Sequence, residues 1–303
     1  MPTLFEFQTQ LGEGIPSIAA AIVKLSTQDA ALAEKDGIII AKDKTIAELR
    51  AQLEALTVPP APVVPPALNI DWTKQPEEYG LVVQAKERSR VTLVNVQSRR
   101  AVRLLTSPGD NNVVGSGDME RCDLSGHSRV YNEGVEQWWS LSLLFPDDFQ
   151  FPTWQNYNLQ GFHHTGSTGS GNFRIGFERG AGLPTTSPGT WVLRGHGGTQ
   201  NQTQFIQPIG VPVRNTWYDF VYHVKWSATV GFFDVWLNGV RKLSHRGPTL
   251  YVGQGAYAKF ANYHTPVCDP YPACVGTHKA SSVLYGPVKM DREKSRVTSA
   301  VLE

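Results

Sequence analysis

The stretch Trp217-Tyr-Asp-Phe-Val-Tyr-His-Val-Lys-Trp226 places a large apolar or aromatic residue at nearly every second position. Alternation of this kind is the period of a β-strand that buries one face. The next segment, Gly231–Leu237, leads into Asn238-Gly239 and then into Val240–Leu243. Because Asn-Gly is a preferred pair for two-residue turns, these segments predict a β-hairpin that follows the first strand.

Short segments of the same character fill the chain from residue 68 to residue 303, and Gly, Asn, Ser and Pro separate them. No long helical period interrupts them. About 235 residues of this pattern predict a single all-β jelly-roll sandwich of the concanavalin-like type. The further predicted strands are Leu81–Gln84, Arg90–Val96, Ala101–Leu105, Trp138–Phe145, Phe173–Phe177 and Trp191–Arg194.

The overall composition excludes several classes of protein. The 303 residues are 41% hydrophobic and carry a net charge of +1, which argues against a nucleic-acid-binding protein with a strongly basic face. No apolar run reaches the length of a membrane span. The segment Met1–Gln10 lacks the basic and apolar regions of a secretory signal. A protein that acts outside its cell without such a signal must leave the cell in another way, for example by lysis with a phage particle. On that basis we expect an extracellular or virion-associated protein.

The N-terminal zone, residues 1–57, has a different period. From Pro16 to Thr57, apolar residues recur at a seven-residue step, which predicts a coiled-coil helix that forms a homo-oligomer, with a trimer favoured over a dimer. The alternative is one amphipathic helix packed on the second domain. Residues 1–15, with Leu4, Phe5 and Phe7, are a candidate anchor for a virion partner. The heptad residues are Ile18, Leu25, Leu32, Ile39, Ile46 and Leu53.

A proline-rich linker, residues 58–67, follows as Val-Pro-Pro-Ala-Pro-Val-Val-Pro-Pro-Ala. This composition favours an extended, semi-rigid spacer. Near the other end of the chain, Cys268 and Cys274 bracket a short loop, and they are either free thiols or a small disulfide-closed loop. No second Cys/His pair has zinc-ligand spacing, so we expect no metal.

The third zone resembles the concanavalin-like jelly-roll polysaccharide lyases, in particular the heparin-lyase-like and glucuronan-lyase-like families. The likeness covers roughly Tyr79 to Met290, and the order and spacing of several motifs carry it. These motifs are Arg121-Cys-Asp-Leu124, Trp138-Trp-Ser-Leu-Ser with Phe145-Pro-Asp-Asp-Phe149, Gln160-Gly-Phe-His163-His164, Trp217–Ser227 with Val235-Trp-Leu-Asn-Gly239, and Tyr251-Val-Gly-Gln-Gly-Ala-Tyr257.

The resemblance implies β-elimination at a uronic acid, without a metal or cofactor. The reaction needs a group that neutralises the carboxylate, a base for the C5 proton and an acid for the leaving oxygen. Arg121 is the candidate carboxylate ligand, or else a structural residue paired with Asp123 across the sandwich. His163 or His164 is the candidate base. Tyr251 is the candidate acid, or the acid and the base together.

The Gln-to-His spacing leaves the register of this strand open. Simple alternation puts Gln160 on the face of His164, so either His164 is the base or a bulge intervenes, with Asn158 as an alternative to Gln160. Trp154 and Trp191 adjoin loops and could stack on sugar rings, while His223 and Lys225 share one strand face. The expected substrate-binding residues are Asn158, Gln160, Trp191, His223, Lys225 and Tyr257, and further positive charge comes from Arg174, Arg194 and His196.

Two functions fit these features. The first is a polysaccharide lyase that acts on an acidic polysaccharide, displayed on an oligomeric phage appendage. The alternative is a non-catalytic carbohydrate-binding decoration or fibre protein of a virion. A glycoside hydrolase is a weaker third reading, because the zone lacks a clear pair of facing acidic residues on one strand.

Overall fold

The computed structural model describes residues 65–113, 115–152, 156–167, 169–177, 189–199, 201–267 and 278–298, together with Ala20 and Ile46. The chain divides into two units, Met1–Ala61 and Pro62–Glu303, and all the strands lie in the second. The predicted coiled coil lies outside the described residues except for Ala20 and Ile46, both of which are helical. Of the described residues, none belongs to a helix long and apolar enough to cross a membrane.

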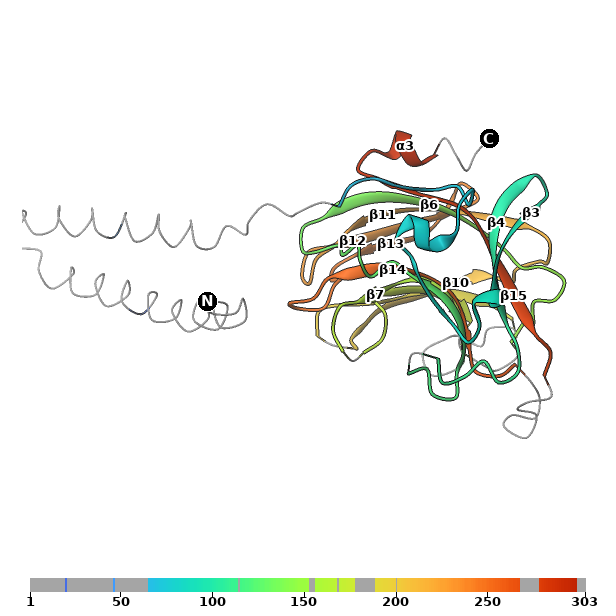
Figure 1. Cartoon of the computed structure of the whole chain (residues 1–303). Coiled ribbons are helices and arrows are strands. Elements are labelled where there is room, and N and C mark those ends of the chain that lie inside the picture. Colours follow the sequence, from blue (N-terminus) through green and yellow to red (C-terminus); the bar gives the residue numbers. More distant parts are fainter. Residues whose placement is uncertain are drawn as a thin grey trace, which may run out of the picture. The chain divides into compact units, whose positions relative to one another are not determined.

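The second unit is a sandwich of two antiparallel sheets, as predicted (Figure 1). The first sheet has the order β13-β12-β11-β6-β15-β4-β3, with β1 paired to β15. Its strands are β1 (Leu68–Ile70), β3 (Val91–Val96), β4 (Arg99–Thr106), β6 (Glu136–Leu144), β11 (Trp217–Lys225), β12 (Phe232–Leu237), β13 (Val240–Arg246) and β15 (Ser281–Asp291).

The second sheet has seven strands in the order β10-β9-β8-β7-β14-β5-β2. Its strands are β2 (Val82–Ala85), β5 (Glu120–Ser125), β7 (Tyr157–His164), β8 (Phe173–Phe177), β9 (Trp191–His196), β10 (Thr203–Gly210) and β14 (Ala256–His264). Three short helices complete the described chain: the 3-10 helices η1 (Pro76–Tyr79) and η2 (Arg88–Arg90), and α3 (Lys294–Thr298). Helix α3 lies on the outer face of the first sheet (Figure 1).

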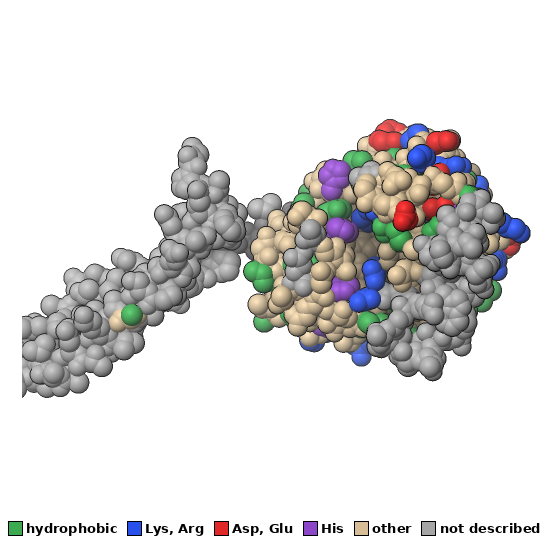
Figure 2. Space-filling view, turned by 90° about the horizontal axis from the view of Figure 1, so that it is seen from below, with side chains coloured by type: hydrophobic (Ala, Val, Ile, Leu, Met, Phe, Trp, Pro, Cys, Tyr) green, Lys and Arg blue, Asp and Glu red, His purple; other side chains and the backbone are tan. Residues whose placement is uncertain are grey.

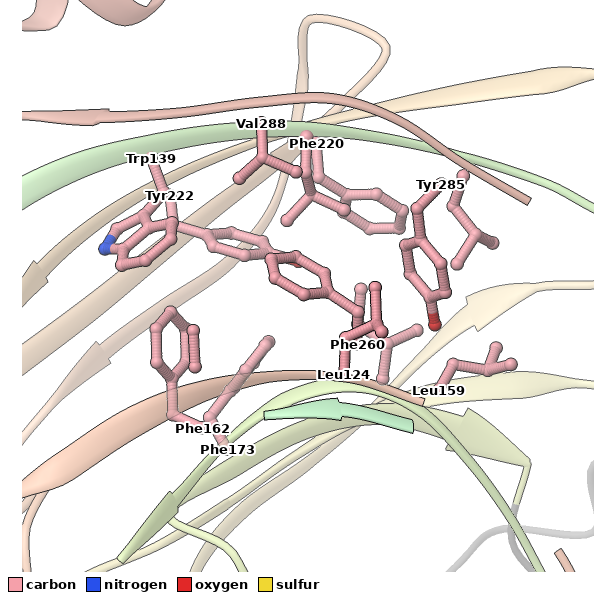
Figure 3. Close-up of a cluster of buried hydrophobic side chains, with 14 of the residues drawn as sticks. Leu124, Trp139, Leu159, Phe162, Phe173, Phe220, Tyr222, Phe260, Tyr285 and Val288 are labelled. Atoms are coloured by element: carbon pink, nitrogen blue, oxygen red, sulfur yellow. The ribbon is translucent and has the colours of Figure 1, made fainter. Parts of the chain in front are cut away.

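The hydrophobic core fills the space between the two sheets (Figure 3). Trp139 and Tyr222 come from the first sheet, and Phe162 and Phe173 come from the second. The ring of Phe173 stacks on that of Phe233 from β12, with 4.2 Å between the centroids. Alternation along each strand thus sends one set of side chains into this core and the other set to an outer face.

Candidate functional site

A pocket of about 300 Å³ lies on the outer face of the seven-stranded sheet. This volume is near the lower end of the range found for small-molecule sites. The pocket is lined by strands β5, β14, β7 and β8 and by residues 169–171. Figure 2 looks onto this face and shows a hollow with Lys, Arg and His side chains at its edge. The Arg, Lys, His and Asp residues of the lining are Arg121, Asp123, His163, Arg174 and Lys259.

Gly161 lies at the centre of the pocket, because it pairs with Lys259 on one side and with Arg174 on the other. A Cβ atom at position 161 would lie 2.3 Å from the carbonyl oxygen of Phe173, a distance that real Cβ atoms do not show. The close approach of β8 therefore requires glycine at this position. Gly161 therefore holds β8, and with it Arg174, close to β7 at this point of the pocket.

Two cations of the pocket share one carboxylate. Oδ2 of Asp123 lies 3.2 Å from Nε of Arg121 and 3.0 Å from Nζ of Lys259. Asp123 is 1% exposed, so it fixes both cations from below the surface. The guanidinium of Arg121 also lies 4.4 Å from the centroid of the Tyr263 ring. The predicted pair of Arg121 with Asp123 is present. It runs along one face of β5 and not across the sandwich.

His163 lines the pocket and is suited to accept a proton. Burial, with the neighbouring His164, Lys259 and Arg121, lowers the pKa of His163 to about 4, so its ring is neutral at pH 7. Nδ1 lies 3.1 Å from the carbonyl oxygen of His164. A carbonyl only accepts, so Nδ1 carries the proton and Nε2 is the basic atom.

Tyr257 is the cross-strand partner of His163. The two rings lie 5.7 Å apart between centroids. Burial raises the pKa of Tyr257, and the charge of Arg121 opposes that rise. The phenol is therefore protonated at neutral pH and lies beside the neutral imidazole.

A β-bulge decides the register that the sequence left open. The pairing of β7 with β8 shifts between Asn158 and Gly161, which inserts one extra residue on β7. As a result, Asn158 and His163 line the pocket, while the Gln160 side chain is buried and accepts a hydrogen bond from the Tyr222 hydroxyl at 2.9 Å. The predicted substrate-binding role of Gln160 does not fit this placement of its side chain.

His164 and Tyr251 also do not fit the roles predicted for them. Each is 1% exposed, and their rings meet edge to face with 5.3 Å between centroids. The Tyr251 hydroxyl donates to the carbonyl oxygen of Ser170 at 2.9 Å, and burial raises its pKa. Nε2 of His164 lies 3.1 Å from the carbonyl oxygen of Gly169. Both side chains lie behind the pocket wall, so neither can reach a sugar in the pocket.

Three other predicted ligands lie elsewhere. Trp191 is 1% exposed and packs in the core against Phe145. His223 and Lys225 belong to β11, so they lie on the outer face of the opposite sheet. There His223 bonds Glu136 at 2.8 Å and stacks on Trp138 with 3.9 Å between centroids. The shared strand face was predicted correctly, but it belongs to the other sheet. Trp154, Cys268 and Cys274 lie outside the described residues.

Lys259 is the pocket residue that the sequence analysis missed. It follows Tyr257 by two residues on β14, so both side chains point outward. The alternation Tyr257-Ala-Lys259 in the sequence therefore predicts that Lys259 shares the face of Tyr257. Arg174, which the sequence marks as a source of positive charge, lines the pocket. Its cross-strand partner Arg194 extends the basic surface onto β9. Within the described chain, no group of three or more His, Cys, Asp or Glu residues is placed to hold a metal ion.

A family model described as "Polysaccharide lyase" matches residues 69–288. No curated protein sequence matches the chain.

Solved structures share the fold at low sequence identity. An endo-β-1,4-glucuronan lyase from the fungus Trichoderma reesei is 17% identical, with 73% of this chain and 92% of that chain covered and a TM-score of 0.51. A GH131 β-glucanase catalytic domain from Podospora anserina is also 17% identical, with 73% and 86% covered and a TM-score of 0.51. The alginate lyase Aly36B is 13% identical, with 77% and 98% covered and a TM-score of 0.51.

Proposed function

The chain belongs to the polysaccharide lyase family, and on that premise we propose that its pocket cleaves a uronate-containing glycan by metal-independent β-elimination. The observation that carries this proposal is the pair of cations, Arg121 and Lys259, which share Asp123 in a pocket that the neutral His163 also lines. Together they supply charge for a carboxylate and a base for a carbon acid.

The cations do the first job of the reaction. Loss of the C5 proton puts negative charge onto the uronate carboxylate, so donors aimed at that group stabilise the intermediate. Arg121 can grip a carboxylate with two parallel hydrogen bonds, and Lys259 adds a point charge. Asn158, on the same side of the pocket as Arg121 and Tyr263, binds the substrate in place of Gln160.

His163 does the second job. Its Nε2 accepts the C5 proton, since Nδ1 is already committed to the carbonyl of His164. A pKa of about 4 makes the free imidazole a weak base. A bound uronate offsets the nearby positive charges and raises that pKa, which strengthens the base when substrate is present.

Tyr257 replaces Tyr251 as the acid. A phenol that protonates the C4 oxygen must touch the sugar, and Tyr251 is buried behind the wall. Tyr257 lies beside His163 and is protonated at neutral pH. The general acid and the general base therefore come from paired positions on β14 and β7.

The evidence for a uronate comes from the pocket and not from the structural neighbours. Identities of 13% and 17% show the fold alone, although two neighbours are named as lyases of glucuronan and alginate. The β-glucanase neighbour raises the alternative of hydrolysis. Glycosidases generally need two carboxyl groups about 5–9.5 Å apart. Among the described lining residues, Asp123 is the one carboxylate, and it is engaged by two cations.

The test is a direct assay for elimination. Purified protein is incubated with alginate, glucuronan and glycosaminoglycans, and the ultraviolet absorbance of the unsaturated product is followed. We expect absorbance to rise with at least one polyuronate and to persist after treatment with a metal chelator. Retained glycan binding with no absorbance change on any polymer would instead support the non-catalytic carbohydrate-binding alternative.

The display of this domain is a second part of the proposal. We infer that residues 16–57 form a homo-oligomer, trimeric by preference, and that residues 1–15 attach to a virion partner, which makes the protein virion-associated. The support is the seven-residue apolar period of the sequence. Sedimentation of the full chain and of a chain lacking residues 1–57 tests it, since a monomer in both cases would contradict the oligomer.

A further inference from the structure

One wall of the pocket consists of small residues held from behind. Gly169, Ser170 and Gly171 line the pocket next to Arg174. This stretch offers no bulky side chain that could pack it in place. Glycine is also the residue whose backbone loses most freedom on folding, so such a wall needs contacts to keep one shape.

Three buried side chains bond the three consecutive carbonyl oxygens of this wall. Nε2 of His164 lies 3.1 Å from the oxygen of Gly169, and the Tyr251 hydroxyl donates to that of Ser170 at 2.9 Å. Nδ1 of His196 lies 3.0 Å from the oxygen of Gly171. The three come from different parts of the chain: the end of β7, the segment before β14, and the end of β9.

Two further side chains bond the amides of the same loop. The Asn201 Oδ1 atom accepts from the amide of Ser170 at 2.8 Å, and Gln254 Oε1 accepts from that of Gly166 at 3.1 Å. Two of the side chains that bond the carbonyl oxygens also contact each other, since the ring of Tyr251 packs on that of His164. Bonds of this kind, each contributing little alone, fix a backbone when they act together.

We propose that Tyr251, with His164 and His196, is a positioning residue that fixes the wall of the pocket and thereby sets how tightly a glycan is held. The inference rests on the proposed function of the pocket as a glycan site. It assigns a role to the two residues, Tyr251 and His164, that the sequence motifs marked for catalysis. It also separates them from His163 and Tyr257, the proposed base and acid.

The wall also defines what the pocket accepts. Gly169, Ser170 and Gly171 present no charge, whereas Arg174 beside them and Lys259 across Gly161 are cationic. A sugar in the pocket therefore meets a neutral, narrow surface on one side and positive charge on the others. If this wall moves away from the sugar, we expect weaker binding, while the proposed acid and base keep their positions.

The test compares Tyr251→Phe with Tyr218→Phe, which removes a different hydrogen bond between a tyrosine and the backbone, the one that the Val213 amide donates to the Tyr218 hydroxyl oxygen at 2.6 Å. Loss of one such bond corresponds to a factor of about two to ten. In Tyr251→Phe we expect amide hydrogen exchange in residues 165–171 to quicken by about that factor. We expect KM for the polymer to rise similarly, with kcat and its pH profile unchanged. Tyr218→Phe changes neither.

Two results would overturn the proposal. One is unchanged hydrogen exchange of residues 165–171 in Tyr251→Phe. The other is a fall in kcat of about 10²-fold or more with KM unchanged and an altered pH profile, which is the behaviour of a general acid. Hydrogen exchange is measured on the free protein, so it decides the positioning role even if the wild type cleaves no polymer. Absence of turnover in the wild type contradicts the proposed lyase function alone.

Discussion

The two outer faces of the sandwich carry similar residues in different arrangements. On the eight-stranded sheet, each of several charges has its own partner: Arg99 with Asp219 at 2.7 Å, and His223 with Glu136 at 2.8 Å. On the seven-stranded sheet, Arg121 and Lys259 share Asp123, and the described pocket lining has three cations to one carboxylate. We call the outer face that carries these one-to-one pairs the balanced face, whereas the described pocket lining on the other face has more cations than carboxylates.

The comparison shows that residue type alone does not identify the site. His223 and Lys225 share a face and look like a polyanion groove in the sequence, yet they lie on the balanced sheet. His163 lies on the other sheet, where it lines the pocket together with Gly161. A site therefore requires both excess charge and a hollow, and only the three-dimensional pairing of strands reveals where they coincide.

The largest expected effect is on turnover. Replacing His163 with alanine removes the proposed base, so we expect kcat on a cleavable polymer to fall about 10²- to 10⁴-fold. The matched change on the balanced face, His223→Ala, should leave kcat within twofold of the wild type. The ultraviolet product assay measures both. Equal losses in the two variants would contradict the distinction between the faces.

Stability separates the two faces next. Asp123 is 1% exposed between two cations, so Asp123→Asn leaves Arg121 and Lys259 without their shared carboxylate. We expect the free energy of unfolding to fall by about 3–5 kcal/mol. Asp234→Asn breaks the pair with Arg246, whose side chain is 61% exposed, and should cost about 1 kcal/mol or less. Urea denaturation of both variants measures the two losses. Equal losses of unfolding free energy would contradict the difference between the two carboxylates.

Affinity for a polyanion should distinguish the two lysines. Lys259→Gln removes one cation from the pocket, and we expect kcat/KM to fall about ten- to a hundredfold, as for a lost charge-assisted hydrogen bond. The effect should shrink as salt is added. Lys225→Gln, on the balanced face, should change kcat/KM less than twofold. A matching fall in Lys225→Gln would indicate that the glycan contacts both faces.

The pH dependence offers the smallest effect. The base must be neutral, so kcat/KM should be full above the pKa of His163 in the free protein, about 4, and fall as pH drops through it. The same depressed pKa affects stability. Between pH 6.5 and 4 the His163 ring is protonated in the unfolded chain but not in the folded one, so the free energy of unfolding falls as pH drops across that window. An acid limb near pH 6.5 that disappears in His163→Ala would show that the ring is not held neutral by its surroundings.

The sandwich was predictable because alternation is local. Strands β6, β11, β12 and β13 follow the predicted ranges closely, and β11 buries every second residue from Phe220 to Val224. The predicted strands do not include β15, where Gly286 and Pro287 break the alternation and the pairing shifts between Tyr285 and Val288. Its place in the centre of a sheet depends on pairing with distant β4 and β6.

The site was predictable only in part. Arg121, Asn158 and His163 line the pocket as expected of outward positions. Gln160 was assigned to the pocket because a strand period of two cannot reveal the bulge that turns its side chain inward. Tyr251 carried the motif, but its burial depends on a loop contact with Ser170, which lies 81 residues away in the sequence. Long-range contacts of this kind are not encoded in any local pattern.

The most direct test of the central claim is to locate a bound glycan. Crystals of the His163→Ala variant would be soaked with an oligouronate that the wild type cleaves or binds. We predict density on the seven-stranded sheet, with a carboxylate between Arg121 and Lys259 and a sugar ring over Gly161. Density on the opposite face beside His223, or none on the seven-stranded sheet, would contradict the account.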